Sequence, residues 1–427
     1  MPPGEPAMNF SIDNDPWQKL YQNVTHPLLM PTVVGFNVVL DRIIPVTPAL
    51  LETSLLSKPE LSRLRSRLLH SMHTCTAEEW FVTDHELYEQ YTRIFSGTGN
   101  LVIGGQAGIA AVHLASIGVP EVLCIAHSVG THTGTILRKA GICVLDIKGG
   151  VGNSSDAIHL VFEYPPGLVP VAEGIVPRNN RFIASPVHEP GSALIPENSR
   201  AAFMSEISRY NRAFLSGFQY LQTEEDFARA AEQILLMKKN ASRMRIHVEC
   251  VSVIDGAVIR GFIHHILPAA DSIGLNENEL LLLLHNLYPD DDEYGNTRVL
   301  SPVQLVNGAI EVFRICNLKR LHLHTFGYYI LVLIKDCAHP DVSRNALLFT
   351  SLTAAHAAKG SCTDFSPVGT CALKQIDDAF GPQLTPGIFR VDRYTIIIIP
   401  TIIAQNITKS SGLGDIISST AFVADQF

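Results

Sequence analysis

The chain has 427 residues, of which 46% are hydrophobic and 17% are charged. Such a chain can bury a large core and has little room for long disordered tails, so it is typical of a globular enzyme with one large domain and an insertion, or with two domains. The formal net charge of −9, with no run of Lys and Arg, argues against nucleic acid as a partner.

Targeting signals are not evident in the sequence. The N-terminus lacks a basic start followed by an apolar segment, so no secretory signal is predicted. The most apolar stretch, residues 396–403, is interrupted by Pro400 and is too short to cross a bilayer as a helix. The eight cysteines form no Cys-x-x-Cys pair and no zinc-like spacing with His. We therefore expect a cytoplasmic protein with reduced thiols and no membrane partner.

Short β-rich segments alternate with amphipathic segments along most of the chain. This pattern predicts an α/β fold with a doubly wound, mostly parallel sheet and helices on both faces. The expected strands are residues 32–40, 122–126, 214–216, 245–249, 272–275, 320–324 and 395–399. The expected helices are residues 106–117, 224–239, 255–265, 279–287, 302–316 and 344–359.

Two regions do not follow this alternation, namely residues 42–99 and residues 148–177. The second is interrupted by Gly149-Gly150 and by Pro165-Pro166-Gly167. We assign both regions to a smaller, β-rich lid that closes over a ligand and excludes water. The large catalytic domain would then comprise residues 1–41, 100–147 and 178–427.

The segment Gly412-Leu413-Gly414-Asp415 lies between an apolar strand and the last expected helix. Glycines allow backbone amides to approach an anion, and the start of the helix adds a positive dipole. Asp415 could take a proton from a hydroxyl while these amides stabilise a phosphoryl group. The alternative is an ordinary helix N-cap, because short Gly-x-Gly-Asp segments also occur there.

Other polar groups follow the ends of expected strands, where doubly wound sheets bind their ligands. Asn37 and Asp41 would end the first strand, and Asp41 could hold sugar hydroxyls or act as a cap or turn residue. The segment from Gly104 through Gly105 and Gln106 to Gly108 lacks the spacing of a dinucleotide fingerprint. It favours a tight turn with close backbone approach.

Glu249 and Glu279 are candidates for a Mg²⁺ site, since this ion needs only one or two carboxylates beside water and substrate phosphates. For residues 276–279 the alternative is the acidic first turn of a helix. Arg181 could bridge phosphate oxygens with its planar guanidinium, or form a salt bridge, and Arg178 is similar. The pair His322 and His324, alternating on one expected strand, is predicted to be structural and hydrogen-bonded.

The order of these motifs is more specific than any one of them. The chain resembles the ADP-dependent glucokinase and phosphofructokinase family, which has a ribokinase-like fold, over nearly its whole length. The resemblance is carried by Gly104-Gly105-Gln106-Ala107-Gly108, Asn180-Arg181-Phe182-Ile183, Ser216-Gly217, His247-Val248-Glu249, Asn276-x-x-Glu279, His322-x-His324-Thr325 and Gly412-x-Gly414-Asp415.

The resemblance implies an activity and roles for these residues. ADP would donate its β-phosphoryl group to a sugar hydroxyl and leave AMP, as in a modified glycolysis. Asp415 would be the base, and Gly412 and Gly414 would form the anion hole beside Arg181. Glu249 and Glu279 would organise Mg²⁺. The implied nucleotide contacts are Asn276, Gly412 and Gly414, and the implied sugar contacts are Asn37, Asp41, Gly105 and Gln106.

The acceptor sugar is left open between fructose 6-phosphate and glucose. Glu79 resembles a glutamate that glucokinases place against glucose, and a carboxylate there should repel a sugar phosphate. Arg178 matches the phosphofructokinase pattern, and its guanidinium could hold a phosphate. Val39 and Ile416 depart from the usual family residues, which puts the substrate in more doubt than the mechanism.

Two alternatives remain at the level of sequence. One is an ATP-dependent kinase of the wider ribokinase-like superfamily that acts on a sugar or nucleoside. The other is a catalytically quiet sensor of sugar or nucleotide, suggested by Val39 and Ile416.

Overall fold

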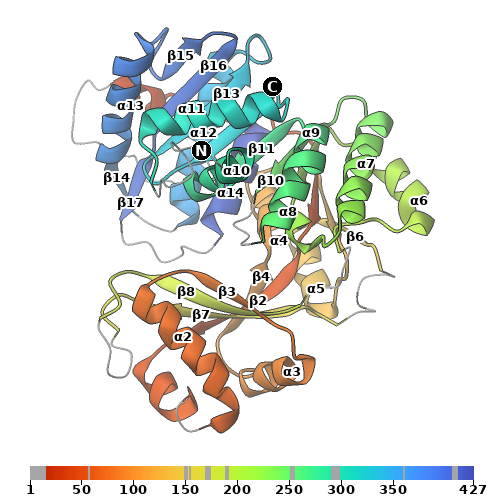
Figure 1. Ribbon diagram of the computed structural model, residues 1–427. Coiled ribbons are helices and arrows are strands. Elements are labelled where there is room, and N and C mark those ends of the chain that lie inside the picture. Colours follow the sequence, from red (N-terminus) through yellow and green to blue (C-terminus); the bar gives the residue numbers. More distant parts are fainter. Residues whose placement is uncertain are drawn as a thin grey trace.

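The computed structural model describes residues 16–55, 58–148, 152, 155–168, 175–187, 192–250, 255–289, 299–358, 361–405 and 412–427. Within them the chain forms two units, each built on its own main sheet, with the smaller unit lying at one edge of the larger (Figure 1). None of the helices in the described parts has the length and apolar character needed to span a bilayer.

The larger unit contains a ten-stranded sheet in the order β15-β16-β13-β12-β11-β10-β9-β1-β5-β6, counted over the described residues. The strands from β6 to β12 are parallel, and β13, β16 and β15 add an antiparallel edge. Their bounds are β1 Thr32–Phe36, β5 Val122–Ala126, β6 Cys143–Asp146, β9 Arg212–Leu215, β10 Arg245–Glu249, β11 Ser272–Leu275, β12 Arg320–His324, β13 Tyr328–Ile334, β15 Ile388–Val391 and β16 Tyr394–Pro400.

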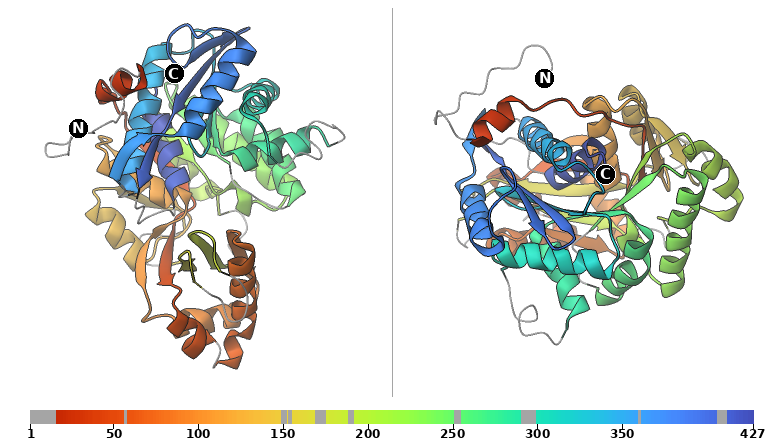
Figure 2. Two further views of the ribbon diagram at one scale, coloured as in Figure 1. Left: turned by 90° about the vertical axis from the view of Figure 1, so that its left-hand side faces the viewer. Right: turned by 90° about the horizontal axis from the view of Figure 1, so that it is seen from above.

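Helices cover both faces of this sheet (Figure 2), which confirms the predicted doubly wound fold. On one face α14 packs between α4 and α12. The helices of the chain are α1 Pro16–Gln22, α2 Ser62–Thr74, α3 His85–Ile94, α4 Gln106–Ser116, α5 Thr131–Lys139, α6 Glu197–Ile207, α7 Glu224–Asn240, α8 Gly256–Gly261, α9 Leu267–Ala269, α10 Glu277–Leu287, α11 Pro302–Ile315, α12 Pro340–Ala357, α13 Pro367–Phe380 and α14 Leu413–Ala424. Short 3-10 or π-helical turns are η1 Leu50–Leu55, η2 Pro59–Leu61, η3 Phe218–Tyr220 and η4 Phe262–Ile266.

The smaller unit is a five-stranded sheet in the order β3-β8-β7-β2-β4. Its face away from the larger unit is covered by α2 and α3 (Figure 1), and buries a separate core that includes Trp80, Tyr91, Phe162 and Phe182. The strands are β2 Val39–Pro45, β3 Glu78–Val82, β4 Asn100–Gly104, β7 Ile158–Tyr164 and β8 Asn180–Pro186. A further two-stranded sheet pairs β14 Ser361–Phe365 with β17 Ile402–Gln405.

The prediction of one strand over residues 32–40 is wrong. β1 ends at Phe36, and β2, which begins at Val39, belongs to the other sheet. The carbonyl of Asn37 accepts the N–H groups of Ala107 and Gly108 at the start of α4, so it is not available to continue the strand ladder. Asp41 therefore lies inside a strand of the smaller unit, not at the end of β1.

Sheet membership also differs from the expected boundaries. β4 and β8, which the sequence placed in the large domain, pair within the five-stranded sheet. Residues 1–15 of the expected large domain, and residues 149–151, 153–154 and 169–174 of the expected lid, lie outside the described residues. We keep the division into a large domain and a lid as a proposal, with β4 and β8 assigned to the lid.

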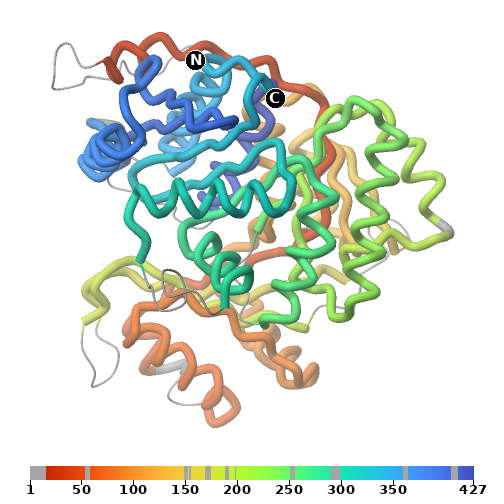
Figure 3. Tube along the Cα trace, turned by 45° about the horizontal axis from the view of Figure 1, so that its top comes forward, coloured from red at the N-terminus to blue at the C-terminus, as the bar shows by residue number. Residues whose placement is uncertain are grey.

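The segment before β1 runs along the surface of the larger unit (Figure 3) and is tied to its C-terminal half. The hydroxyl of Tyr21 donates to the carbonyl of Pro400 at 2.6 Å. The side chain of Asn345 accepts from the backbone N–H of Thr25 and donates to its carbonyl. These contacts fasten the start of the described chain to α12 and β16.

A buried ion pair lies beneath α14. Arg320 and Asp425 are both fully buried, and Nε of Arg320 lies 3.0 Å from Oδ2 of Asp425. Arg320 also donates to the carbonyl of Ala421, and Ser343 donates to Oδ1 of Asp425. Removing one partner of such a pair leaves an uncompensated charge in the interior.

We therefore expect Asp425→Asn to lower the free energy of unfolding by about 3–5 kcal/mol. The matched change Glu197→Gln affects the exposed Arg200–Glu197 pair, and should cost no more than about 1 kcal/mol. Urea denaturation followed by circular dichroism measures both variants. Equal midpoints for the two would contradict the importance of the buried pair.

Candidate active site

The first turn of α14 carries Asp415 at the carboxyl edge of the ten-stranded sheet. Gly412 caps this helix with φ of 75°, and a Cβ atom there would lie 2.7 Å from Cδ1 of Ile109. Burial raises the pKa of Asp415 to about 7, and the positive charge of Arg181 opposes the shift. Asp415 thus lies in the first turn of a helix, at the positive end of the helix dipole, with the raised pKa that suits a general base.

Glu249 and Glu279 lie at the same edge of the sheet. Glu249 ends β10, and Glu279 is in the first turn of α10, which follows the neighbouring strand β11. Glu249 is buried, and its pKa is raised well above the usual range, first by burial and further by the charges of Glu279 and Asp415. Three acidic groups within electrostatic reach of one another favour a bound cation. Mg²⁺ fits this donor set, because it is held by few carboxylates and takes its other ligands from water and phosphate.

The interpretation of residues 276–279 as the acidic first turn of a helix is confirmed, and their role at a Mg²⁺ site stays a prediction. Asn276 caps α10, accepting the N–H of Glu279 at 3.0 Å, and Oε2 of Glu279 accepts the N–H of Asn276 at 2.9 Å. This capping box fixes the Glu279 carboxylate. Within the described residues no group of three or more His, Cys, Asp or Glu side chains could hold a metal. A cation here would therefore depend on the phosphates of a ligand.

Asn37, Gly105 and Gln106 lie together where the chain passes between the sheets. Gly105 has φ of 72°, and a Cβ atom there would lie 2.5 Å from the carbonyl oxygen of Asn37. Gln106 donates to the carbonyl of Cys250 at 3.3 Å. The side-chain oxygens of Asn37 and Gln106 are buried and have no hydrogen-bond partner among the described atoms. Two unpaired buried acceptors suit a ligand that brings hydroxyl donors.

One face of the lid sheet carries polar side chains, while the other face forms the lid core. Asp41 on β2 pairs in register with His159 on β7, and Nδ1 of His159 lies 4.0 Å from Oδ1 of Asp41 and 3.9 Å from Oε1 of Glu79. Ser185 donates to Oε1 of Glu79 at 2.6 Å. Because side chains alternate along a strand, Arg181 shares the face of Ser185. We call Asp41, Glu79, His159, Arg181 and Ser185 the lid cluster.

The lid cluster faces Asp415. Burial raises the pKa of Asp41 to about 7, Arg181 opposes this shift, and the charges of Glu79 and Asp415 add to it. Burial also raises the pKa of Glu79, whose side chain remains 37% exposed. Arg181 acts on Asp41, Glu79 and Asp415 alike, so it lies between the lid and the start of α14.

The space beside Asp41 depends on a glycine. A Cβ atom at Gly104, on the paired strand β4, would lie 2.2 Å from the carboxyl carbon of Asp41. No side chain can therefore occupy position 104 while Asp41 keeps its place.

The structure does not bring Arg178 to the lid cluster. It is exposed and precedes β8, and its carbonyl accepts the thiol of Cys75 at 3.8 Å. Its charge acts on Tyr164, which lies in the lid core on the opposite face of the sheet. Arg181 is thus the arginine that the described residues place beside the carboxylates.

Sequence reasoning missed His159 and Ser185, and also Tyr220, whose raised pKa reflects burial and the nearby charges of Glu79 and Asp41. The available signal was the alternation in residues 158–164, which places His159 and Glu163 opposite Leu160 and Phe162. That alternation does not say which strands pair.

The prediction that His322 and His324 are hydrogen-bonded is wrong for both ring nitrogens of His322 and for one ring nitrogen of His324. Both ring nitrogens of His322 and Nδ1 of His324 are buried without a partner among the described atoms. Burial lowers the pKa of His324 to about 4, so the ring is neutral. A Cβ atom at Gly414 would lie 3.3 Å from Nε2 of His324, which places this ring directly beside the start of α14.

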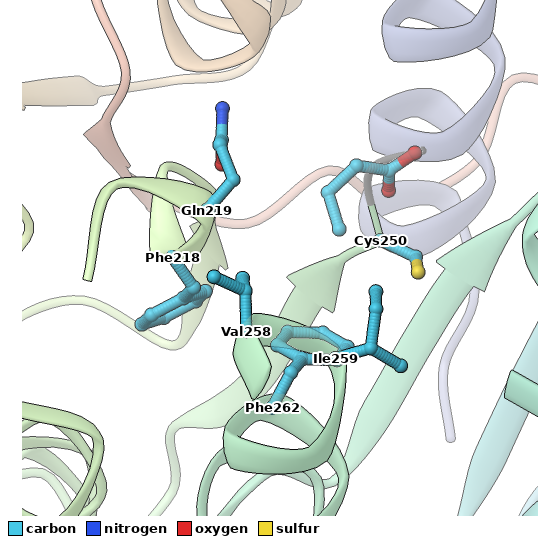
Figure 4. A pocket seen from close by; sticks show the side chains of 7 residues that line it. Phe218, Gln219, Cys250, Val258, Ile259 and Phe262 are labelled. Carbon is cyan, nitrogen blue, oxygen red and sulfur yellow. The ribbon is translucent and has the colours of Figure 1, made fainter. Parts of the chain in front are cut away.

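A small, partly open apolar pocket adjoins Glu249. Phe218, Val258, Ile259 and Phe262 gather around it, and Gln219 and Cys250 lie at its upper side in Figure 4. Glu249 therefore borders an apolar space as well as the acidic groups, which accounts for much of the rise in its pKa.

Comparison with known proteins places this geometry in context. A family model described as the ADP-specific phosphofructokinase/glucokinase conserved region matches residues 33–424. An ADP-dependent glucose/glucosamine kinase from Pyrococcus furiosus is 28% identical over 96% of this chain and 98% of its own length. An ADP-specific phosphofructokinase from Thermococcus zilligii is 25% identical over 84% of each chain.

Solved structures share the fold. An ADP-dependent kinase in complex with fructose-6-phosphate and ADPbetaS superposes with a TM-score of 0.76 at 22% identity, covering 96% of each chain. A hypothetical ADP-dependent phosphofructokinase from Pyrococcus horikoshii gives a TM-score of 0.76 at 22% identity, covering 94% of this chain and 98% of the other.

Proposed function

This chain belongs to the ADP-specific phosphofructokinase/glucokinase family, and on that premise we propose that it transfers the β-phosphoryl group of ADP to a hydroxyl of glucose, leaving AMP. The observation that carries the proposal is the meeting of Asp415 with the lid cluster, because it sets a candidate base opposite groups that bind hydroxyls. Both substrates are metabolites of the cell interior, and a cytoplasmic location is part of the proposal.

The residues have separate tasks in this reaction. Asp415 accepts the proton of the attacking sugar hydroxyl. The amides from Gly412 to Gly414 and the helix dipole stabilise the charge of the transferring phosphoryl group. Arg181 neutralises the oxygens between donor and acceptor. Glu249 and Glu279 would hold Mg²⁺, which when bound to ADP withdraws charge from the phosphates. Asn276 and its helix N-terminus would lie beside the nucleotide.

The sugar is proposed to lie between the lid cluster and the start of α14. The carboxylates of Asp41 and Glu79 can each accept hydrogen bonds from sugar hydroxyls, and Ser185 fixes the orientation of Glu79. The unpaired oxygens of Asn37 and Gln106 supply further acceptors, with Gly105 giving close backbone approach.

The charge of this site favours glucose over fructose 6-phosphate. A sugar phosphate would bring a dianion among Asp41, Glu79 and Asp415, with Arg181 as the compensating cation. Arg178, the second cation that could hold a phosphate, is exposed before β8, and its charge acts on Tyr164 of the lid core. A neutral hexose avoids this repulsion.

The direct test measures AMP release from ADP and Mg²⁺ with glucose, with fructose 6-phosphate and with no sugar, using ATP as a control donor. We expect release with glucose to exceed release with fructose 6-phosphate. Release with fructose 6-phosphate alone would overturn the choice of acceptor. A preference for ATP would support a kinase of the wider superfamily. Binding of ADP in calorimetry without AMP release from any hexose would support a sensor.

Replacing the proposed base should abolish most turnover. Asp415→Asn keeps the shape of the side chain but removes its ability to accept the hydroxyl proton, and should lower kcat by about 10²–10⁴-fold. Calorimetric binding of ADP should change little, since the helix amides remain. The control Asp377→Asn changes a carboxyl group on α13 and should leave kcat unchanged. Equal turnover for Asp415→Asn and the native chain would refute the assignment.

The pH dependence follows from the raised pKa of the base. Asp415 must be ionised to accept a proton, and burial raises its pKa to about 7. As the pH falls below 7 the carboxylate is lost, so kcat/KM should fall about tenfold per pH unit, and it should level off at higher pH. A rate profile from pH 5 to 9 tests this. A flat profile down to pH 5 would contradict the buried base.

A further inference from the structure

The face of the ten-stranded sheet beneath α14 is polar although it is buried. Along this face lie His247 and Glu249 on β10, Ser272 on β11 and Arg320 on β12, each with 4% or less of its surface exposed. Polar groups in such a position are costly unless they are hydrogen-bonded to one another. These four residues and Ser418 of α14 form a continuous chain of hydrogen bonds, which we call the buried chain.

Three residues of the buried chain, Ser418, Glu249 and His247, come together over Gly274, which has no side chain. Gly274 on β11 pairs in register with Glu249. A Cβ atom at Gly274 would lie 2.0 Å from Oγ of Ser418, 2.4 Å from Oε2 of Glu249 and 2.8 Å from Nε2 of His247. The contact among these three side chains therefore requires that no side chain stand at position 274.

The buried chain has a direction, because one end consists only of donors. Nη1 of Arg320 donates to Oγ of Ser272 at 3.2 Å. Oγ of Ser272 lies 2.8 Å from Nδ1 of His247, and we assign the hydroxyl hydrogen of Ser272 to this bond, which makes Nδ1 the acceptor. A neutral imidazole that accepts at Nδ1 carries its hydrogen on Nε2, and Nε2 of His247 lies 3.2 Å from Oε2 of Glu249 and 3.1 Å from Oγ of Ser418. With this tautomer the N–H of His247 points at the pair formed by Glu249 and Ser418.

The second donor to Glu249 comes from the helix that carries the base. Ser418 donates to Oε2 of Glu249, the same oxygen that faces His247. Neither bond uses Oε1. Ser418 follows Asp415 by three residues, about one turn of α14, so this bond links the helix of the proposed base to the strand of a proposed metal ligand.

We propose that Ser418 and His247 are positioning residues that hold the Glu249 carboxylate by Oε2 and turn Oε1 toward the Mg²⁺ of the nucleotide, and that Arg320 sets the direction of the chain of bonds. The proposal rests on the proposed function. Its consequence is a fixed spacing between Glu249 and Asp415. The ADP held at Glu249 and the base Asp415 would then keep a constant distance from each other. Removing a residue that hydrogen-bonds to a metal ligand commonly lowers metal affinity or activity by about 10–100-fold.

The test compares two variants that each remove a buried serine hydroxyl bonded to a carboxylate. Ser418→Ala removes the donor to Glu249. Ser343→Ala removes the donor to Asp425, and Ser343 is also fully buried. Calorimetry measures binding of Mg²⁺ with ADP in the absence of sugar, thermal unfolding measures stability, and kinetics give the Mg²⁺ requirement and the KM for glucose.

We expect Ser418→Ala to weaken binding of Mg²⁺ with ADP by about 10–100-fold, with the KM for glucose changed by less than about threefold. Ser343→Ala should bind Mg²⁺ with ADP as tightly as the native chain does. This should hold even if its thermal unfolding temperature falls as much as that of Ser418→Ala. Ser272→Ala, which removes the link to Arg320, should also weaken binding, and by less than Ser418→Ala.

The result that would overturn the proposal is native Mg²⁺ and ADP affinity in Ser418→Ala, or an equal loss of affinity in Ser343→Ala. Either would show that these serines act only on stability. Failure of the proposed function is distinct, because the native chain would then release no AMP from ADP with glucose, whatever the affinities of the serine variants.

Discussion

The buried positive charge of Arg320 has to be compensated inside the protein. The contacts that compensate it also fix the position of α14, which carries Asp415. The guanidinium lies fully buried under α14, held by Asp425, by the carbonyl of Ala421 and by Ser272. The first two of these partners belong to α14 or to the residue directly after it. The same contacts therefore fix the rotation and depth of the helix that carries Asp415 at its other end.

The proposed site lies where the two sheets meet. The large sheet supplies Glu249, the start of α14 and the start of α4, whereas the lid sheet supplies Asp41, Glu79, His159 and Arg181. The chain crosses between the sheets at residues 37–38, and the backbone of Asn37 is fixed there by α4. A ligand held by both sheets would be shielded from water, which favours transfer of a phosphoryl group to a hydroxyl over its hydrolysis.

The lid cluster and Asp415 concentrate negative charge around Arg181. Burial raises the pKa of Asp41, Glu79 and Asp415, and each shift is opposed by this guanidinium. Such a site is poised for a ligand that brings its own cation to the acidic edge and hydroxyl groups to the lid. The same charges disfavour an acceptor that is itself a dianion, so specificity follows from electrostatics as much as from shape.

The sequence by itself determined the doubly wound sheet and the helix that carries Asp415. Those elements have strong local signals: buried apolar strands such as residues 122–126, and a glycine turn at Gly412. Only the tertiary structure decided that the first strand divides at Asn37, that β8 joins the lid, that Arg178 lies apart and that His159 lies beside Asp41 and Glu79. The physical reason is that strand pairing is non-local. A period of two says which residues share a face, while the partner strand decides what that face meets.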